Sequence, residues 1–374
     1  MKLIDVCDFQ GGSQPPKEEW AFEEQDGYIR MLQIRDFTQS EKVIPEYIKV
    51  SNSTKTCEVD DILIARYGAS IGKILTGLAG AYNVAIMRTV PDTSKVQKRY
   101  LYYYLKSPYF QNAILNVGSR AAQAGFNKED LSKLEIKCPA LIDQGEIVSV
   151  LEKVESVIQK RKQELQLLDN LIKARFVELF VGKKYEIVKA GSIIKEMRNG
   201  VSPSTSGGHF EKVLTLSAIT QGKFDDKAWK EGFFTDCPSA EKRITEDDFY
   251  ICRGNGNKSL VGMGVYALEN RPDLVFPDTV IAAHIDTERM VLPYLWIMWQ
   301  QPEVRKQLES GARTTNGTYK INQKVISEIK IICPPINEQE VFADFVKQAN
   351  KSKVINQLLQ KWNYMYHVTI EKVK

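Results

Sequence analysis

The chain has 374 residues, of which 43% are hydrophobic and 26% are charged, a balance that excludes an intrinsically disordered protein and leaves room for two or three packed domains. No apolar run reaches the roughly 18 residues of a membrane span, and the first residues lack the apolar core of a signal peptide, so we expect a cytoplasmic protein with no membrane partner. The net charge of +4 permits nucleic-acid binding without indicating it.

The cysteines and histidines lack the spacing of a metal site. No two cysteines form a C-x-x-C pair, and the three histidines are scattered. We therefore expect no metal and no cofactor, and we interpret the cysteines as buried, reduced thiols. They are Cys7, Cys57, Cys138, Cys237, Cys252 and Cys333.

The clearest organisational feature is an internal repeat, in which four segments of the first half recur in the same order in the second half. The paired segments lie between 187 and 195 residues apart, a drift that loop insertions would produce. They are residues 12–15 and 200–203, 60–66 and 247–253, 118–120 and 311–313, and 138–144 and 333–339. A period of this length predicts a duplicated domain and not a short-repeat solenoid.

Each copy begins with a mixed region and continues into a helix. In the first copy, short β-type runs at residues 62–65 and 84–87 flank a glycine-rich turn at 67–72. A helical stretch follows at 100–116 and is matched by 292–308 in the second copy. The aromatic residues of these stretches are typical of core packing and not of a cofactor site.

Each copy then ends in a long helix with an apolar seam. Residues 143–180 contain no proline and only one glycine, Gly145, and their apolar residues recur at alternating steps of four and three. These seam residues are Ile147, Leu151, Val154, Ile158, Leu165, Leu168, Ile172 and Leu179. At about 1.5 Å per residue, this helix is a rod of roughly 57 Å.

Residues 338–371 repeat the seam less regularly. Its apolar members are Val341, Phe345, Ile355, Leu359, Trp362 and Tyr366. Because a long seam needs a partner, we expect the two helices to pack antiparallel and to hold the two mixed domains apart. The alternative, in which each helix packs on its own domain, is disfavoured because the rod is longer than a domain of about 140 residues is wide.

The expected fold is therefore α+β, with two mixed α/β domains separated by two long antiparallel helices in a pseudo-twofold internal repeat. The domain boundaries that we expect are 1–140 for the first mixed domain, 141–182 for the central helix, 183–335 for the second mixed domain and 336–374 for the C-terminal helix.

Signatures of common catalytic sites are absent from the sequence. It contains no G-x-x-x-x-G-K-[ST], no G-x-S-x-G and no H-E-x-x-H, and residues 254–259 fail as a phosphate loop because Asn257 replaces the required glycine. Residues 135–137 and 328–330 have the E-x-K ending of a Mg²⁺-dependent nuclease. We favour the interpretation that they are polar faces of strands, and we keep the nuclease as an alternative.

Two similar domains on a two-helix spacer would suit DNA, which offers readable sites at fixed spacing along a rod. Arginine and lysine can neutralise phosphates or pair with guanine, and asparagine or glutamine can pair with adenine. Such side chains lie beside the glycine-rich turns of both copies. The candidate DNA-binding residues are Arg30, Gln33, Arg35, Arg66, Tyr67, Lys73, Arg120, Gln123, Arg198, Arg253, Asn255, Asn257, Lys258, Arg313 and Asn316.

The order of domain, helix, domain, helix resembles the specificity subunits of type I restriction-modification enzymes. The resemblance is carried by the G-x-x-P turn of each half, by residues 60–73 (DDILIARYGASIGK), by the G-S-R-x-x-x-x-G-F segment at 118–126 and by the C-P-x-x-x-x-Q entry to each long helix. It covers essentially the whole chain, and the first half is the closer match because residues 249–256 depart from the pattern.

The resemblance implies two target recognition domains, each reading half of a split site in double-stranded DNA, with helices that set the gap. It also implies a non-catalytic chain whose partners are two modification (methyltransferase) subunits, which methylate adenine, and ATP-dependent restriction subunits. A stand-alone DNA-binding protein of the same shape is the main alternative; it would bind DNA tightly without partner subunits.

Overall fold

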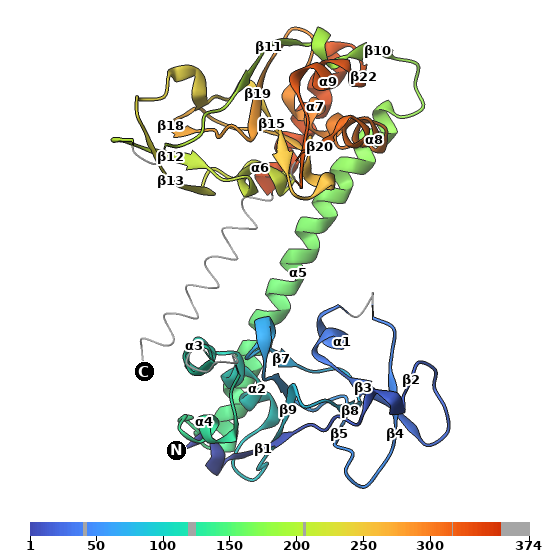
Figure 1. Cartoon of the computed structure of the whole chain (residues 1–374), viewed down its shortest axis with the longest axis vertical. Helices are drawn as coiled ribbons and strands as arrows, with labels where there is room; N and C mark the ends of the chain where they lie inside the picture. The colour runs from blue at the N-terminus through green and yellow to red at the C-terminus, as the bar shows by residue number, and fades with distance from the viewer. Residues whose placement is uncertain (40–42, 119–124, 205–206, 316, 353–374) are drawn as a thin grey trace. The chain divides into compact units, whose positions relative to one another are not determined.

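The computed structural model describes residues 1–39, 43–118, 125–204, 207–315 and 317–352 of the chain (Figure 1). The chain forms two compact units, Met1–Gln159 and Lys160–Lys374. Each is an α+β unit with its own hydrophobic cores. The long helix α5, Leu141–Phe180, begins in the first unit and ends in the second.

The first unit contains two sheets. A central four-stranded sheet has the order β1 (Cys7–Gly11), β9 (Ile86–Pro91), β6 (Leu63–Ala65) and β7 (Ile74–Leu75). The second sheet has the order β2 (Trp20–Ala21), β4 (Tyr47–Lys49), β3 (Tyr28–Leu32), β8 (Gly80–Tyr82) and β5 (Thr56–Cys57). The helices that precede α5 are α1 (Ile34–Thr38), α2 (Lys98–Lys106), α3 (Pro108–Gly118) and α4 (Lys128–Ser132).

The second unit repeats this plan and adds to it. Its central sheet has the order β11 (Ile194–Asn199), β19 (Val280–Ile285), β15 (Asp248–Cys252) and β17 (Gly264–Tyr266). Its second sheet has the order β13 (Trp229–Phe234), β12 (His209–Leu214), β18 (Arg271–Val275) and β14 (Arg243–Ile244). The unit also contains two smaller sheets. One has the order β16 (Gly254–Asn255), β21 (Thr318–Lys320) and β20 (Arg313–Thr315), and the other pairs β10 (Glu186–Lys189) with β22 (Lys330–Cys333). The helices are α6 (Ser217–Thr220), α7 (Leu292–Trp299), α8 (Pro302–Gly311) and α9 (Gln323–Glu328).

The duplication expected from the sequence is visible in the hydrogen bonding. The order β1-β9-β6-β7 corresponds to β11-β19-β15-β17, and all the pairings in both sheets are antiparallel. In the outer sheets, β3 pairs in parallel with β8, as β12 does with β18. The 60–66 and 247–253 segments therefore supply equivalent central strands, β6 and β15.

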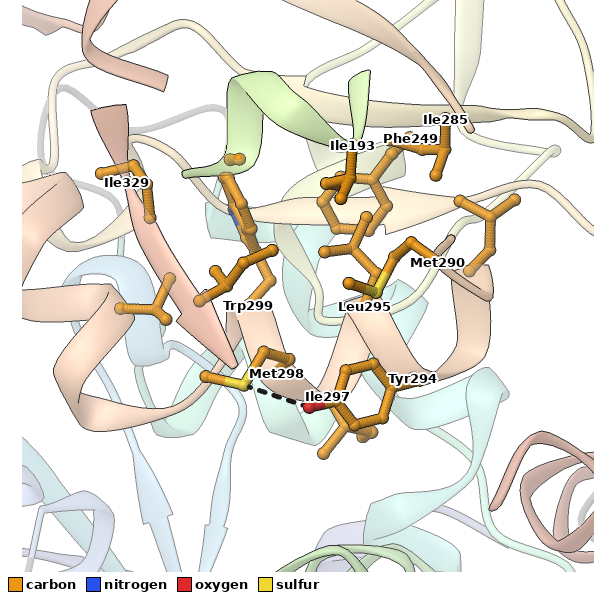
Figure 2. Packing of buried hydrophobic residues seen from close by; sticks show 14 of the residues in the cluster. Ile193, Phe249, Ile285, Met290, Tyr294, Leu295, Ile297, Met298, Trp299 and Ile329 are labelled. Carbon is orange, nitrogen blue, oxygen red and sulfur yellow. Dashed lines mark hydrogen bonds between the residues drawn. The ribbon is translucent and has the colours of Figure 1, made fainter. Parts of the chain in front are cut away.

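The helical stretches of the two copies are each divided by a proline. The run expected at 100–116 is two helices, α2 and α3, because Pro108 lacks the N–H that would continue the first and instead begins the second. Pro302 divides the run expected at 292–308 in the same way. The aromatic residues do pack in the core: Phe249 lies 5.6 Å from Trp299, and the hydroxyl of Tyr294 lies 3.8 Å from the sulfur of Met298 (Figure 2).

Helix α5 is amphipathic along the predicted seam, although its most buried residues are displaced from that seam. All eight apolar seam residues are at least partly buried, whereas most of their neighbours on the helix are exposed. The residues that enter the core of the second unit are Ile172, Phe176 and Phe180, spaced by four. The heptad pattern predicted only Ile172, because the end of α5 enters the core of the second unit, where Phe176 and Phe180 contact both Tyr294 and Phe342.

A second helix, residues 336–352, packs antiparallel on the part of α5 within the second unit. Phe342 contacts Phe176 and Phe180 near the end of α5, whereas Ser352 lies beside Leu168, nearer the middle of α5. Phe345 lies beside Leu171 and Ala174 of α5, whereas the predicted seam residue Val341 is exposed and its neighbour Phe342 is buried. The seam residues Ile355, Leu359 and Trp362 lie outside the described residues.

A buried glutamine anchors the start of each long helix. The side-chain oxygen of Gln144 accepts a hydrogen bond from the Gln97 backbone, and its amide donates to the carbonyls of Lys95 and Pro139, each at 2.8 Å. Gln339 makes the same three bonds in the second unit, at 2.8–3.1 Å. The glutamine of the repeated C-P-x-x-x-x-Q motif thus has a structural role, because its side chain bonds the start of the helix to the loop before α2 or α7.

Candidate nucleic-acid interface

Three of the candidate DNA-binding residues are held by carboxylates of the first unit. Arg30 forms an ion pair of 2.8 Å with Asp36, whose side chain is only 2% exposed. Gln33 and Arg35 both contact the carboxylate of Glu46. Since these side chains already have acidic partners, they are poorly placed to neutralise phosphate.

Arg198 has the same kind of internal role in the second unit. It forms an ion pair with Asp248, which is fully buried and also accepts a hydrogen bond of 2.7 Å from the Thr245 hydroxyl. An uncompensated charge at this depth would be strongly destabilising, so Arg198 is needed to stabilise the fold. The sequence could not separate such arginines from surface ones, because Asp248 lies 50 residues away along the chain.

Arg66, by contrast, is bound only by neutral partners. Its guanidinium donates to the carbonyl oxygens of Phe126 and Val84, both at 3.3 Å, and lies 5.0 Å from the centre of the Tyr67 ring. It has no carboxylate partner among the described residues. The two carbonyls fix the side chain without neutralising its charge, which leaves it available to an anion.

Arg253 occupies the equivalent position in the second unit. Its guanidinium donates to the carbonyl of Asp278 at 3.1 Å, and its backbone N–H donates to Thr279 at 2.8 Å. The Arg66 backbone makes the same 2.8 Å bond to Ala85, the residue that follows Val84. Over the described part of the chain, Arg253 also lacks a carboxylate partner. In both units, therefore, an arginine at the end of the central strand donates from its guanidinium to an equivalent backbone carbonyl, that of Val84 or Asp278.

The glycine-proline turns of the repeat lie beside these arginines. A Cβ atom on Gly12 would lie 2.1 Å from the carbonyl oxygen of Asn83, and one on Gly200 would lie 2.1 Å from that of Pro277. Only glycine permits so close an approach of two backbones. In the first unit a Cβ on the adjacent Gly11 would lie 3.4 Å from the Arg66 guanidinium, so the turn forms a wall of the arginine site.

Further cations are exposed around the two arginines. Lys73, Lys258 and Arg313 are exposed and form no ion pair within the described ranges. In the β16-β21-β20 sheet, Arg313 pairs with Lys320, which pairs in turn with Gly254, the residue after Arg253. The same sheet carries Lys320, an exposed cation that sequence reasoning missed because no motif marks it. Arg120, Gln123 and Asn316 lie outside the described residues.

Asn255 and Asn257 act mainly within their own loop. The side-chain oxygen of Asn255 accepts a hydrogen bond of 2.9 Å from the Asn257 backbone. That of Asn257 accepts two, from the backbone and hydroxyl of Ser259, at 3.0 and 2.9 Å. Because a side-chain amide oxygen has two lone pairs, Asn257 retains only its N–H groups for an outside partner and cannot form the paired contact that asparagine makes with adenine.

The expectation that both E-x-K segments are polar faces of strands is wrong for the second one. Glu135 takes part in a single bridge with Lys2, whereas Glu328 ends the helix α9 and forms an ion pair of 2.7 Å with Lys189. No group of three or more histidine, cysteine or acidic side chains suited to a metal occurs among the described residues.

No helix within that same part of the chain is long and apolar enough to cross a membrane.

The cysteines are all free, but their burial differs from the expectation. Cys7, Cys57 and Cys252 are buried, Cys138 and Cys333 are half-buried, and Cys237 is exposed. Burial raises the pKa of the Cys7 thiol to about 12 and those of Cys57 and Cys252 to about 11. These three are inert packing residues, whereas Cys237, which follows β13, lies at the surface.

The chain is similar to known proteins in part of its sequence and in its fold. Residues 1–168 match the family described as type I restriction modification DNA specificity domain. The type I restriction enzyme StySPI specificity subunit of Salmonella potsdam is 21% identical over 280 residues, which cover 68% of this chain and 58% of that protein. The chain thus spans less than two thirds of the length of this relative.

Two solved structures share the fold. The S subunit of a type I restriction-modification system from M. genitalium matches with a TM-score of 0.53 and 13% identity, over 99% of this chain and 93% of that one. A chain from a study of complex assembly and conformational transition of the type I R-M system also matches with a TM-score of 0.53, at 15% identity, over 100% of this chain and 94% of that one.

Proposed function

We propose that the chain is the DNA-specificity subunit of a type I restriction-modification complex, since residues 1–168 match the family described as type I restriction modification DNA specificity domain. Each unit reads one half of a bipartite site in double-stranded DNA. The observation that carries the proposal is the equivalent presentation of Arg66 and Arg253, which are held by backbone carbonyls and have no carboxylate partner in the described ranges.

Two chemical roles are available to these arginines. A guanidinium can bind a phosphate and so fix the register of the unit on the duplex, or it can pair with O6 and N7 of guanine in the major groove. Exposed Lys73 in the first unit, with Lys258, Arg313 and Lys320 in the second, supplies further positive charge beside the arginines. Arg30, Arg35 and Arg198 keep the strands and loops in place.

The long helices have a separate role in the proposal. Leu167 and Leu171 on α5 are 65% and 50% exposed, and Leu171 lines a groove together with Ala174 and Phe345. Exposed apolar side chains on a helix pair are typical of a surface that another protein covers. We assign this surface to the modification subunits and assign the length of α5 to the spacing between the half-sites.

The chain itself forms and breaks no covalent bonds in this proposal. Adenine methylation belongs to two modification subunits, and cleavage belongs to ATP-dependent restriction subunits. The specificity subunit supplies only the DNA contacts and the platform on which the other subunits assemble. We assign no cofactor to it.

The test is a reconstitution with the methyltransferase encoded beside this gene. We expect the two proteins to co-purify as a complex with two methyltransferases per specificity chain, and we expect specific DNA binding by the complex at least about tenfold tighter than by this chain alone. Tight, specific binding by the isolated chain with no such complex would establish the stand-alone DNA-binding protein instead. Cleavage by the isolated chain with Mg²⁺, abolished by Lys137→Ala, would establish a nuclease.

A further inference from the structure

One pair of facing residues differs in kind between the two otherwise equivalent sites. In the first unit, Tyr67 follows Arg66 and forms a β-bridge with Gly125. In the second unit, Gly254 follows Arg253 and pairs with Lys320 in the same antiparallel manner. The large residue therefore follows the arginine in the first unit, whereas in the second unit it lies on the facing strand and glycine follows the arginine.

The equivalence of these positions follows from their neighbours. Phe126 and Ile321 come next after Gly125 and Lys320, and each is bonded to the arginine of its unit: the Phe126 carbonyl accepts from the Arg66 guanidinium, and the Ile321 backbone N–H donates to the Arg253 carbonyl. Asn127 and Asn322 then cap the helices α4 and α9 through the same side-chain hydrogen bond. The two segments are therefore in register on both sides of the pair.

Each glycine provides the space for the side chain that faces it. A Cβ on Gly125 would lie 2.5 Å from the Tyr67 ring, so the ring lies directly over that glycine. A Cβ on Gly254 would lie 3.4 Å from Cγ and 3.9 Å from Cε of Lys320, so the lysine stem runs across that glycine. Neither glycine has a positive φ, so the backbone admits a side chain at either position.

The two arrangements present different chemistry beside the same arginine. Tyr67 is 39% exposed and offers a neutral ring and a hydroxyl, stacked against the Arg66 guanidinium. Lys320 is exposed and offers a positive charge, with no ion-pair partner among the described residues. A lysine can donate to O6 and N7 of guanine, whereas an aromatic ring is suited to the methyl group of thymine.

We infer that the facing pairs Tyr67/Gly125 and Gly254/Lys320 are specificity-determining positions, at which the two units select different bases beside the contact of the shared arginine. The inference rests on the proposed function and goes beyond it by naming which positions make the two half-sites differ. Arg66 and Arg253 are alike and supply what the half-sites have in common. The facing pair supplies part of the difference.

The test is a reciprocal exchange, with the methylated sequence as the readout. The first variant is Tyr67→Gly with Gly125→Lys, and the second is Gly254→Tyr with Lys320→Gly; each keeps one large and one small residue and removes the side chain that the new one would face. Each variant is co-expressed with the modification subunit, and the methylated sites are read by genome sequencing. Because the two exchanges are made in different units, failure of one to fold leaves the other as the test.

We expect each exchange to alter one or two adjacent positions in a single half-site, with a fall of about tenfold in methylation of the original half-site. The first should introduce a preference for guanine, and the two should alter opposite halves. An unchanged motif with full methylation, or alteration of the same half by both variants, would overturn the inference. If the unaltered chain directs no bipartite motif, the proposed function itself fails, which is a distinct result.

Discussion

Arg88 and Arg198 form ion pairs with two equivalent buried aspartates, but they come from opposite members of the same cross-strand pair. Arg88, on β9, lies 2.7 Å from Asp61 and faces Gln10 on β1. Arg198, on β11, pairs with Asp248 and faces Ala282 on β19. Each unit therefore keeps one arginine for its buried carboxylate, supplied from one strand or the other.

This relationship predicts a rescue. Arg88→Ala should lower the free energy of unfolding by about 2 kcal/mol, less than the loss of a whole buried pair, because Lys98 still lies 2.9 Å from Asp61. Adding Gln10→Arg should restore at least half of the loss, as judged by urea denaturation. Gln10→Arg in the unaltered chain is the control and should have little effect. No recovery in the double variant would show that the two positions are not interchangeable.

The same site predicts an acid-dependent contribution to stability. Burial favours the protonated form of Asp61, but hydrogen bonds from the Glu58 backbone, Lys98 and Arg88 outweigh it and hold the pKa below its ordinary value. Because the folded pKa is the lower one, this stabilisation is present above the ordinary aspartate pKa and is lost as the pH falls through the folded pKa. Asp61→Asn should therefore flatten the decline of stability in acid, measured as unfolding free energy against pH.

The buried glutamines predict a large effect from a small substitution. Gln144→Ala removes three hydrogen bonds to backbone groups and leaves the Gln97 N–H without its partner, so we expect a loss of about 2–3 kcal/mol in unfolding free energy. Gln163→Ala, at an exposed position of the same helix, is the matched control and should change stability by less than about 0.5 kcal/mol. Equal effects of the two substitutions would contradict the anchoring role.

Much of the fold could be predicted from the sequence because short motifs recur in the same order in both halves of the chain. The second aspartate of each Asp-Asp pair, Asp61 or Asp248, and the glutamine of each long helix recur in order, and each has the same structural role in both units. The division of the arginines could not be predicted. Arg30 and Arg66 are alike in the sequence, and only the folded chain brings one to Asp36 and the other to backbone carbonyls.

The difference between arginines paired with carboxylates and arginines held only by backbone carbonyls predicts which substitutions weaken DNA binding. Arg66→Ala and Arg253→Ala should each weaken binding of the assembled complex to its target by about tenfold or more, without loss of assembly. Arg35→Ala is the matched control, since Arg35 is already paired with Glu46, and it should have a much smaller effect. Fluorescence anisotropy at two salt concentrations gives both the affinity and the salt slope. Greater loss in the control than in the test variants would reverse the assignment.

The cysteines predict a selective chemical labelling. Iodoacetamide at pH 8 should modify Cys237 rapidly in the folded chain, because that thiol is exposed. Cys7, with a pKa of about 12, and Cys57 and Cys252, with pKa values of about 11, should remain unmodified until denaturant is added. Peptide mass spectrometry measures each site separately. Rapid modification of Cys252 in the native chain would contradict its placement in the core.

The length of α5 predicts the spacing of the half-sites. Deleting residues 151–157 removes one heptad, which keeps the helix faces nearly in phase and shortens the helix by about 10 Å. That length corresponds to about three base pairs of DNA. The gap between the half-sites in the methylated motif should shorten accordingly. A gap that stays fixed would show that α5 does not set the spacing.

The central claim is that two units of one chain read two halves of one DNA site, and the most direct measurement is sequencing of methylated adenines in cells with and without this gene. The account predicts a motif of two different short sequences separated by a fixed gap, present only when the chain is present. A motif that persists after deletion of the gene, or a continuous motif without a gap, would contradict it.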